Sequence, residues 1–195
     1  MTIANKLTIF RVLLIPIFLW AFYSPWSGSW PLSLVPLLVF VLASVTDWLD
    51  GYLARKRGEV TTFGKFMDPL ADKLLVTAAL VAFVDLGYLS GIVAIIIISR
   101  EFIVTGLRLV AISDNKVIAA GFWGKLKTIL QISVIIAILL LRISVDFDWD
   151  IIFVWIMLSY AVILQWSIWV MAAVTVISGF EYVWKNRGLL KSGGK

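Results

Sequence analysis

The chain has 195 residues, of which 62% are hydrophobic, and its formal net charge is +5. Soluble domains are closer to half apolar, so this composition indicates a membrane protein with one domain, residues 1–195. These residues include no cysteine and no histidine, which excludes disulfides, thiolate chemistry and metal sites with nitrogen or sulfur ligands. The positive charge is typical of cytoplasmic loops beside a membrane, and we expect no nucleic-acid partner.

Six apolar segments follow one another along the chain, each near the roughly 20 residues that a membrane-spanning helix needs. They cover residues 7–25, 33–54, 67–86, 91–112, 125–142 and 152–183. Backbone in lipid must satisfy its own hydrogen bonds, and no β pattern is present. The segments therefore predict an all-α bundle of six transmembrane helices in a lipid bilayer. The last segment is too long for one perpendicular crossing, so we expect it to tilt.

Lysine and arginine gather in alternate connections between these segments. The connection 55–66 and the tail 185–195 each carry four of them, and Lys116 lies in the connection 113–124. The intervening connections carry no charge or mainly acids. Because basic loops stay on the cytoplasmic side, we predict that both termini are cytoplasmic. The prediction is a multi-pass protein of the cytoplasmic (inner) membrane.

Four aspartates lie in one run at the end of the second segment and the start of the third. The run reads Asp47-x-x-Asp50-Gly51-x-x-Ala54-Arg55, then eight residues, then Gly64-x-x-x-Asp68-x-x-x-Asp72. Carboxylates in hydrocarbon are costly and usually functional, so a group of four needs a neutralising partner. Without histidine or cysteine, the ligands suit two hard cations such as Mg²⁺ or Mn²⁺. We therefore predict a two-metal site that opens to the cytoplasm.

Other residues of the run favour a phosphorylated ligand. Small residues leave room for a ligand beside the backbone, and Arg55 is placed to bind a phosphate. Two alternatives stay open: interfacial acids that pair with neighbouring cations such as Lys73, and an ion pathway in a small cation transporter. The ion pathway does not account for the small residues or for Arg55.

The run resembles, at every fixed position, the signature of CDP-alcohol phosphotransferases. That resemblance implies transfer of a phosphatidyl or similar group from a CDP-activated donor to an alcohol, with release of CMP. It implies that a two-metal centre on the donor's pyrophosphate is held by Asp47, Asp50, Asp68 and Asp72. It also implies that Asp72 is the general base on the acceptor hydroxyl. The cytidine and phosphate site would be lined by Gly51, Ala54, Arg55 and Gly64.

A second group of charges lies in the fourth and fifth segments. Arg100 and Glu101 fall near the expected midplane, and Arg108 lies nearer the cytoplasmic end. We predict that Arg108, Lys125 and Lys127 form a pocket for an anionic acceptor. Arg100 is a further candidate for binding the acceptor. In the alternative, Arg100 and Glu101 pair to brace the bundle, and the two lysines reach from the helix to the membrane surface.

Within the family, the runs 5–11, 100–108 and 124–128 are similar to the branch that makes phosphatidylglycerolphosphate. This implies CDP-diacylglycerol as the donor and sn-glycerol 3-phosphate as the acceptor. Asn5, Thr8 and Arg11 share one helix face, and they either border the substrate site or form an amphipathic surface helix. Inositol phosphate, serine and phosphatidylglycerol stay open as alternative acceptors, and a homodimer stays open as the assembly.

Overall fold

The structure, a computed structural model, describes the backbone of residues 3–24, 32–57, 62–113, 121–145 and 151–187. It describes the side chains of residues 9–24, 32–46, 73–111, 121–143 and 158–187. This part of the chain is helical and contains no strand, as expected. The elements are α1 (Ile3–Tyr23), the 3₁₀ turn η2 (Leu32–Leu34), α2 (Val35–Arg57), α3 (Thr62–Asp85), α4 (Gly91–Ser113), α5 (Phe122–Val145) and α6 (Ile151–Lys185).

Each of the six predicted segments corresponds to one helix, which confirms the all-α fold. The first residue of a helix differs most from its predicted position in α3, which begins at Thr62 and not at residue 67. Gly64 was expected in a connection and instead lies in the first turn of this helix. The aspartate run therefore lies on two helices joined by only four residues, 58–61.

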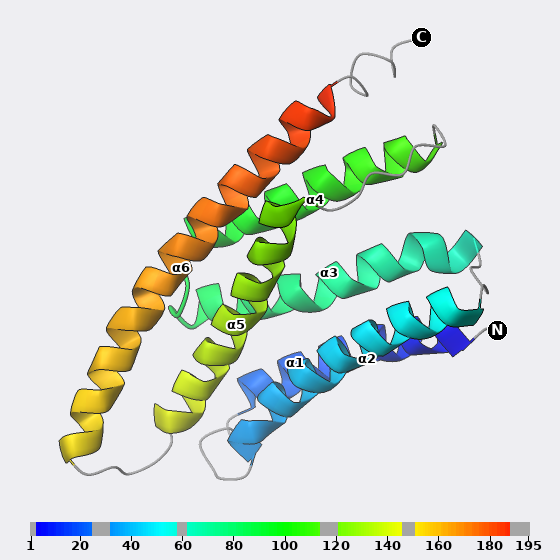
Figure 1. Cartoon of the computed structure of the whole chain (residues 1–195). Coiled ribbons are helices and arrows are strands. Elements are labelled where there is room, and N and C mark those ends of the chain that lie inside the picture. The colour runs from blue at the N-terminus through cyan, green and yellow to red at the C-terminus, as the bar shows by residue number, and fades with distance from the viewer. Residues whose placement is uncertain (1–2, 25–31, 58–61, 114–120, 146–150, 188–195) are drawn as a thin grey trace.

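The helices alternate in direction, so the bundle has two ends. In Figure 1 the ends of α2, α4 and α6 point to the upper right, and the ends of α1, α3 and α5 point to the lower left. Helix α1 packs against α2 and α3, whereas α4 and α5 both pack against α6. With 35 residues, α6 is about 52 Å long, which exceeds the hydrocarbon core of a bilayer.

An aromatic core joins the first three helices. Phe18 and Phe22 of α1 stack with their ring centroids 5.7 Å apart. The Phe22 ring also lies 5.6 Å from Phe83 of α3, and the Phe18 ring lies 6.5 Å from Phe40 of α2. All four side chains are buried, and truncation of such a ring typically costs about 3–5 kcal/mol. The Arg142 guanidinium lies 4.1 Å from the Phe22 ring centroid, which connects α5 to this core.

Large apolar side chains also cover the outside of the bundle. Trp20 and Trp166 are each 70% exposed, and many exposed leucine, isoleucine and valine side chains accompany them. Exposed apolar surface of this extent marks a surface that meets another apolar phase. Within the described residues, two segments are long and apolar enough to cross a membrane: Phe122–Ile143 of α5 and Leu158–Lys185 of α6.

A glycine ends α3 and allows the chain to turn back into α4. Gly87 has a φ of 77°, in the left-handed region where a Cβ is unfavourable. The Gly87 amide donates to the Val84 carbonyl at 3.1 Å, and the Tyr88 amide donates to the Phe83 carbonyl at 2.8 Å. This is the hydrogen-bond pattern of a Schellman cap. The cap therefore depends on the backbone freedom of Gly87.

Gly87→Ala is expected to destabilise the protein by about 1–2 kcal/mol, because alanine must adopt the left-handed conformation. Thermal unfolding of the purified protein in detergent would show a lower midpoint. Gly106→Ala is the matched control, since Gly106 lies inside α4 and a methyl group there would meet no atom within 4 Å. That variant should match or exceed the wild-type midpoint. Equal midpoints for the two variants would contradict the role of the cap.

Candidate functional site

An ionic cluster around Glu101 on α4 lies inside the described bundle. We call Lys73, Arg100, Glu101 and Lys127 the Glu101 cluster. Glu101 Oε2 lies 3.2 Å from Lys73 Nζ of α3, and Oε1 lies 3.1 Å from Arg100 Nη1. Oε1 also pairs with Lys127 Nζ of α5. One carboxylate thus binds cations from three helices.

Further hydrogen bonds extend the cluster to a fourth helix. Arg100 Nη2 donates to Ser178 Oγ of α6 at 2.6 Å. Lys73 Nζ also donates to the Glu101 carbonyl oxygen at 3.2 Å and to Thr105 Oγ1. The Thr105 hydroxyl in turn donates to the Glu101 carbonyl oxygen at 2.7 Å. The cluster therefore connects α3, α4, α5 and α6.

Two glycines let the neighbouring helices approach Arg100. A Cβ on Gly179 of α6 would lie 3.0 Å from Arg100 Cγ, closer than ordinary van der Waals contact. A Cβ on Gly124 of α5 would lie 3.8 Å from Arg100 Nη2. Small residues at these positions allow the long arginine side chain to lie between α4, α5 and α6.

The cluster is largely withdrawn from solvent but is not sealed. The side chain of Lys127 is 4% exposed, that of Arg100 12%, and those of Lys73 and Glu101 15% each. Three cations surround one carboxylate, and among the described side chains no other acid pairs with them. The local charge within this part of the structure is therefore two positive. Such an excess in a partly buried site is suited to an anionic ligand.

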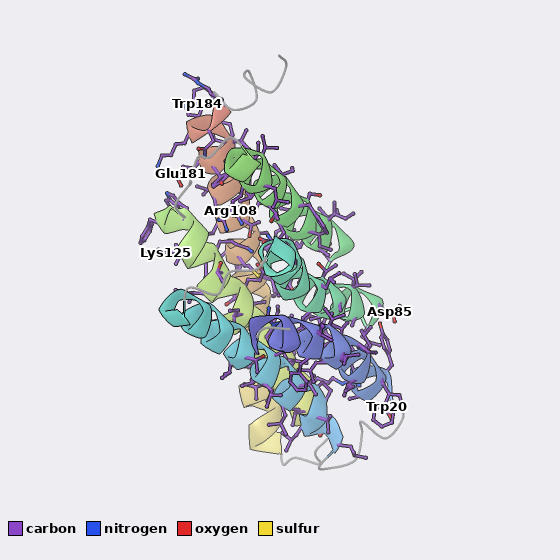
Figure 2. The ribbon with its side chains drawn as sticks, turned by 90° about the vertical axis from the view of Figure 1, so that its right-hand side faces the viewer. Trp20, Asp85, Arg108, Lys125, Glu181 and Trp184 are labelled. Carbon is purple, nitrogen blue, oxygen red and sulfur yellow. The ribbon has the colours of Figure 1, made fainter. Side chains whose placement is uncertain are left out.

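Other predicted site residues occupy different surroundings. Arg11 is buried on α1, the helix that contacts both α2 and α3. Arg108 and Lys125 are exposed, and within the described side chains no ion pair joins either of them to the Glu101 cluster. Figure 2 shows both residues in the same part of the molecule as Glu181 and Trp184, away from Asp85 and Trp20.

The different positions of Lys125 and Lys127 follow from helix geometry. Residues two apart are separated by about 200° around a helix, so both cannot point into one pocket from the same straight helix. Lys127 points inward to Glu101, and Lys125 faces outward. The structure thus brings Arg100 and Lys127 of the predicted acceptor pocket together, with Arg108 and Lys125 at the surface.

The side chains of the remaining predicted site residues lie outside the described residues. They are Asn5, Thr8, Asp47, Asp50, Gly51, Ala54, Arg55, Gly64, Asp68 and Asp72. Their backbone belongs to α1, to the last turns of α2 and to the first turns of α3. Among the described side chains, no group of three or more acids could hold a metal ion. The metal centre therefore stays a prediction on the four aspartates.

Sequence reasoning does not assign Lys73, Ser178 or Gln131 to a substrate site. The sequence suggests Lys73 only as a counter-ion for the aspartates, whereas it pairs with Glu101. Ser178 lies in a long apolar helix and is only 2% exposed. Gln131 lies one turn after Lys127, and its buried side-chain oxygen accepts no hydrogen bond from the described residues. The one signal in the sequence is that each is polar and interrupts an apolar helix.

Comparison with known proteins identifies the family. A sequence model of the CDP-alcohol phosphatidyltransferase family matches residues 1–177. The chain is 42% identical to the CDP-diacylglycerol–glycerol-3-phosphate 3-phosphatidyltransferase of Bacillus subtilis, over 96% of both chains. It is 50% identical to the protein of that name from Haemophilus influenzae, over 64% of this chain and 68% of the relative. The Pseudomonas fluorescens relative, with the same name, is 36% identical over 100% of this chain and 95% of its own. The chain therefore belongs to the CDP-alcohol phosphatidyltransferase family.

Proposed function

We propose that this protein transfers the phosphatidyl group of CDP-diacylglycerol to sn-glycerol 3-phosphate and releases CMP. The observation that carries the proposal is the similarity to relatives named for this activity, one of which matches nearly the full length of the chain. The aspartate run supports the reaction class, and the positive excess of the Glu101 cluster supports a phosphorylated acceptor. Inositol phosphate, serine and phosphatidylglycerol are the alternative acceptors.

The proposed setting is a single membrane domain, residues 1–195, whose six helices all span the cytoplasmic membrane. The alternating helix directions and the exposed apolar side chains support this arrangement. The ends of α2, α4 and α6 share one end of the bundle with most of the basic connections. By the positive-inside rule, that end and both termini are cytoplasmic. The active site then opens toward the water-soluble acceptor.

The proposed metal ligands are Asp47, Asp50, Asp68 and Asp72. Carboxylates alone suit Mg²⁺ or Mn²⁺, and helical spacing puts the acids of each helix on one face. Two such ions would neutralise the pyrophosphate of the donor. Arg55, one turn beyond Gly51 on α2, adds a cation for the same phosphates, and the small residues Gly51, Ala54 and Gly64 leave room for the nucleotide.

The proposed reaction is a direct displacement at the phosphatidyl phosphorus. A hydroxyl oxygen of the acceptor forms the new P–O bond, and its proton passes to the Asp72 carboxylate. The bond from this phosphorus to the bridging pyrophosphate oxygen breaks, and CMP leaves with that oxygen. Because the chain contains no histidine, a carboxylate is the natural general base.

The proposed acceptor pocket lies beside this centre, on α1, α4 and α5. Arg100 and Lys127 supply buried positive charge, and the exposed Arg108 and Lys125 attract the acceptor's phosphate from the cytoplasm. On α1, the pocket or the adjoining donor site would be bordered by Asn5, Thr8 and Arg11.

The first test is CMP release by the purified protein in detergent with CDP-diacylglycerol and Mg²⁺. We expect release with sn-glycerol 3-phosphate and little without an acceptor or with serine or inositol phosphate. Release with another alcohol would retain the reaction class and refute the acceptor. No release with any acceptor from folded protein would favour a cation-transport role for the aspartates.

Asp72→Asn is expected to lower the rate of CMP release by about 10²–10⁴-fold, because it removes the proposed general base and a metal ligand. The matched control is Asp85→Asn, which changes an exposed aspartate at the other end of α3. Rates are compared at saturating concentrations of both substrates. Equal losses in the two variants would mean that general damage to α3, and not the chemistry of Asp72, is responsible.

Arg108→Ala is expected to raise the KM for glycerol 3-phosphate several-fold, because an exposed positive charge that attracts the acceptor's phosphate is lost. The KM for CDP-diacylglycerol should change little. Arg187→Ala removes the same charge from an exposed arginine that stacks on Trp184, and it should leave both KM values unchanged. An unchanged KM for glycerol 3-phosphate in Arg108→Ala would remove Arg108 from the acceptor pocket.

A further inference from the structure

We propose that Glu101 is a positioning residue for the acceptor. Its carboxylate assembles the three cations of the Glu101 cluster and leaves them with two positive charges for a phosphate monoester. The inference rests on the proposed function, because it concerns the acceptor of that reaction. It explains why an acidic side chain, Glu101, lies inside a proposed binding site for an anion.

The geometry shows how the Glu101 carboxylate fixes the positions of the three cations. Glu101 Oε2 lies 3.2 Å from Lys73 Nζ of α3. Glu101 Oε1 lies 3.1 Å from Arg100 Nη1 and also pairs with Lys127 Nζ of α5. Both oxygens are therefore engaged, and each cation approaches from a different direction. Without the acid, three like charges would share a partly buried site and repel one another strongly, because the local dielectric is low. They would then separate or lose their common orientation.

The remaining charge fits one class of acceptor. A phosphate monoester carries about −1.5 to −2 charges at pH 7, which matches the two positive charges of the cluster. A phosphodiester carries one negative charge and would leave the cluster partly unmatched. A neutral alcohol would gain no ion pair from the cluster, and a zwitterionic one would bring an ammonium group that the cations repel. Glu101 thus sets the charge at the buried part of the proposed pocket, which favours a dianion there.

The cluster is also open enough to meet a ligand. Lys73 and Glu101 keep 15% of their side chains exposed, and Arg100 keeps 12%. The exposed part of Arg100 excludes its Nε, which is buried and donates no hydrogen bond to the described residues. A phosphate that approaches the cluster can therefore be bound by cations whose positions are already set.

The position of Lys73 links the cluster to the proposed chemistry. Lys73 follows Asp72 directly in the sequence, on the same helix α3. Its ion pair with Glu101, reinforced by the contact with Thr105, fixes how α3 lies against α4 at this point. The same carboxylate therefore sets both the acceptor's cations and the helix that carries the proposed base.

The test compares Glu101→Gln and Glu101→Asp with the wild type in steady-state CMP release. Glu101→Gln keeps the size and removes the charge, so we expect the KM for glycerol 3-phosphate to rise about tenfold or more. The KM for CDP-diacylglycerol should change less than about twofold. Glu101→Asp keeps the charge one methylene further away and should give an intermediate KM. A fixed concentration of glycerol 3-phosphate should raise the melting temperature most in the wild type, less in Glu101→Asp and least in Glu101→Gln.

Glu181→Gln is the matched control, since it makes the same change in the more exposed pair of Glu181 with Lys185. It should retain the wild-type KM. If Glu101→Gln lowers only kcat or the folded fraction, with the KM for glycerol 3-phosphate unchanged, Glu101 merely braces the bundle and the inference is overturned. A lower KM for glycerol 3-phosphate in Glu101→Gln would also overturn the inference, because Glu101 would then only compete with the phosphate for the cations. If Glu101→Gln does not fold, Glu101→Asp decides by the same criterion.

The wild-type assay separates this inference from the proposed function. Wild-type activity with glycerol 3-phosphate, together with an unchanged KM in the Glu101 variants, refutes the inference alone. Wild-type protein that releases CMP only with serine refutes the proposed acceptor and, with it, the role of the cluster's charge.

Discussion

The pairing of Glu101 with three cations is the polar constraint that joins the middle helices of the bundle. The cations come from α3, α4 and α5, and Arg100 extends the contact to Ser178 of α6. Removal of one partner from a buried ion pair typically costs about 3–5 kcal/mol, because the other charge is left unpaired. Among the described side chains, the loss of this one acid would leave three cations without an acidic partner. One side chain thus links α3, α4 and α5 at this point of the bundle.

The bundle has its cluster of stacked aromatic rings away from the aspartate run. Phe22 and Phe83 lie near the ends of α1 and α3, at the opposite end of the bundle from the aspartate run. Rings packed at this end can hold α1, α2 and α3 together without entering the region that needs small and charged residues. The site can therefore carry repelling charges and glycines such as Gly179 while the fold draws its stability from elsewhere.

Sequence reasoning succeeds where the signal is local. Five of the helices have 21 to 24 residues and α6 has 35, and each contains an apolar run of about 20 residues or more, so their existence and approximate bounds follow from composition. Partners across the bundle carry no such signal: Lys73 is 28 residues from Glu101, and Arg100 is 78 residues from Ser178. The opposite directions of Lys125 and Lys127, in contrast, are predictable from helix geometry. The four aspartates are recognised by their spacing, and their arrangement stays a prediction.

An acid inside the proposed anion site has a physical rationale. Three cations without a counter-ion would stay hydrated or move apart, and the acceptor would have to gather and desolvate them as it binds. The Glu101 carboxylate gathers and desolvates these cations when the protein folds. The binding of the phosphate then does not have to supply the free energy for that step. The carboxylate also lowers the attraction, because it reduces the charge of the cluster from three to two. In the proposed pocket, some affinity is lost in exchange for selectivity, since a dianion would match the cluster better than an alcohol of lower charge.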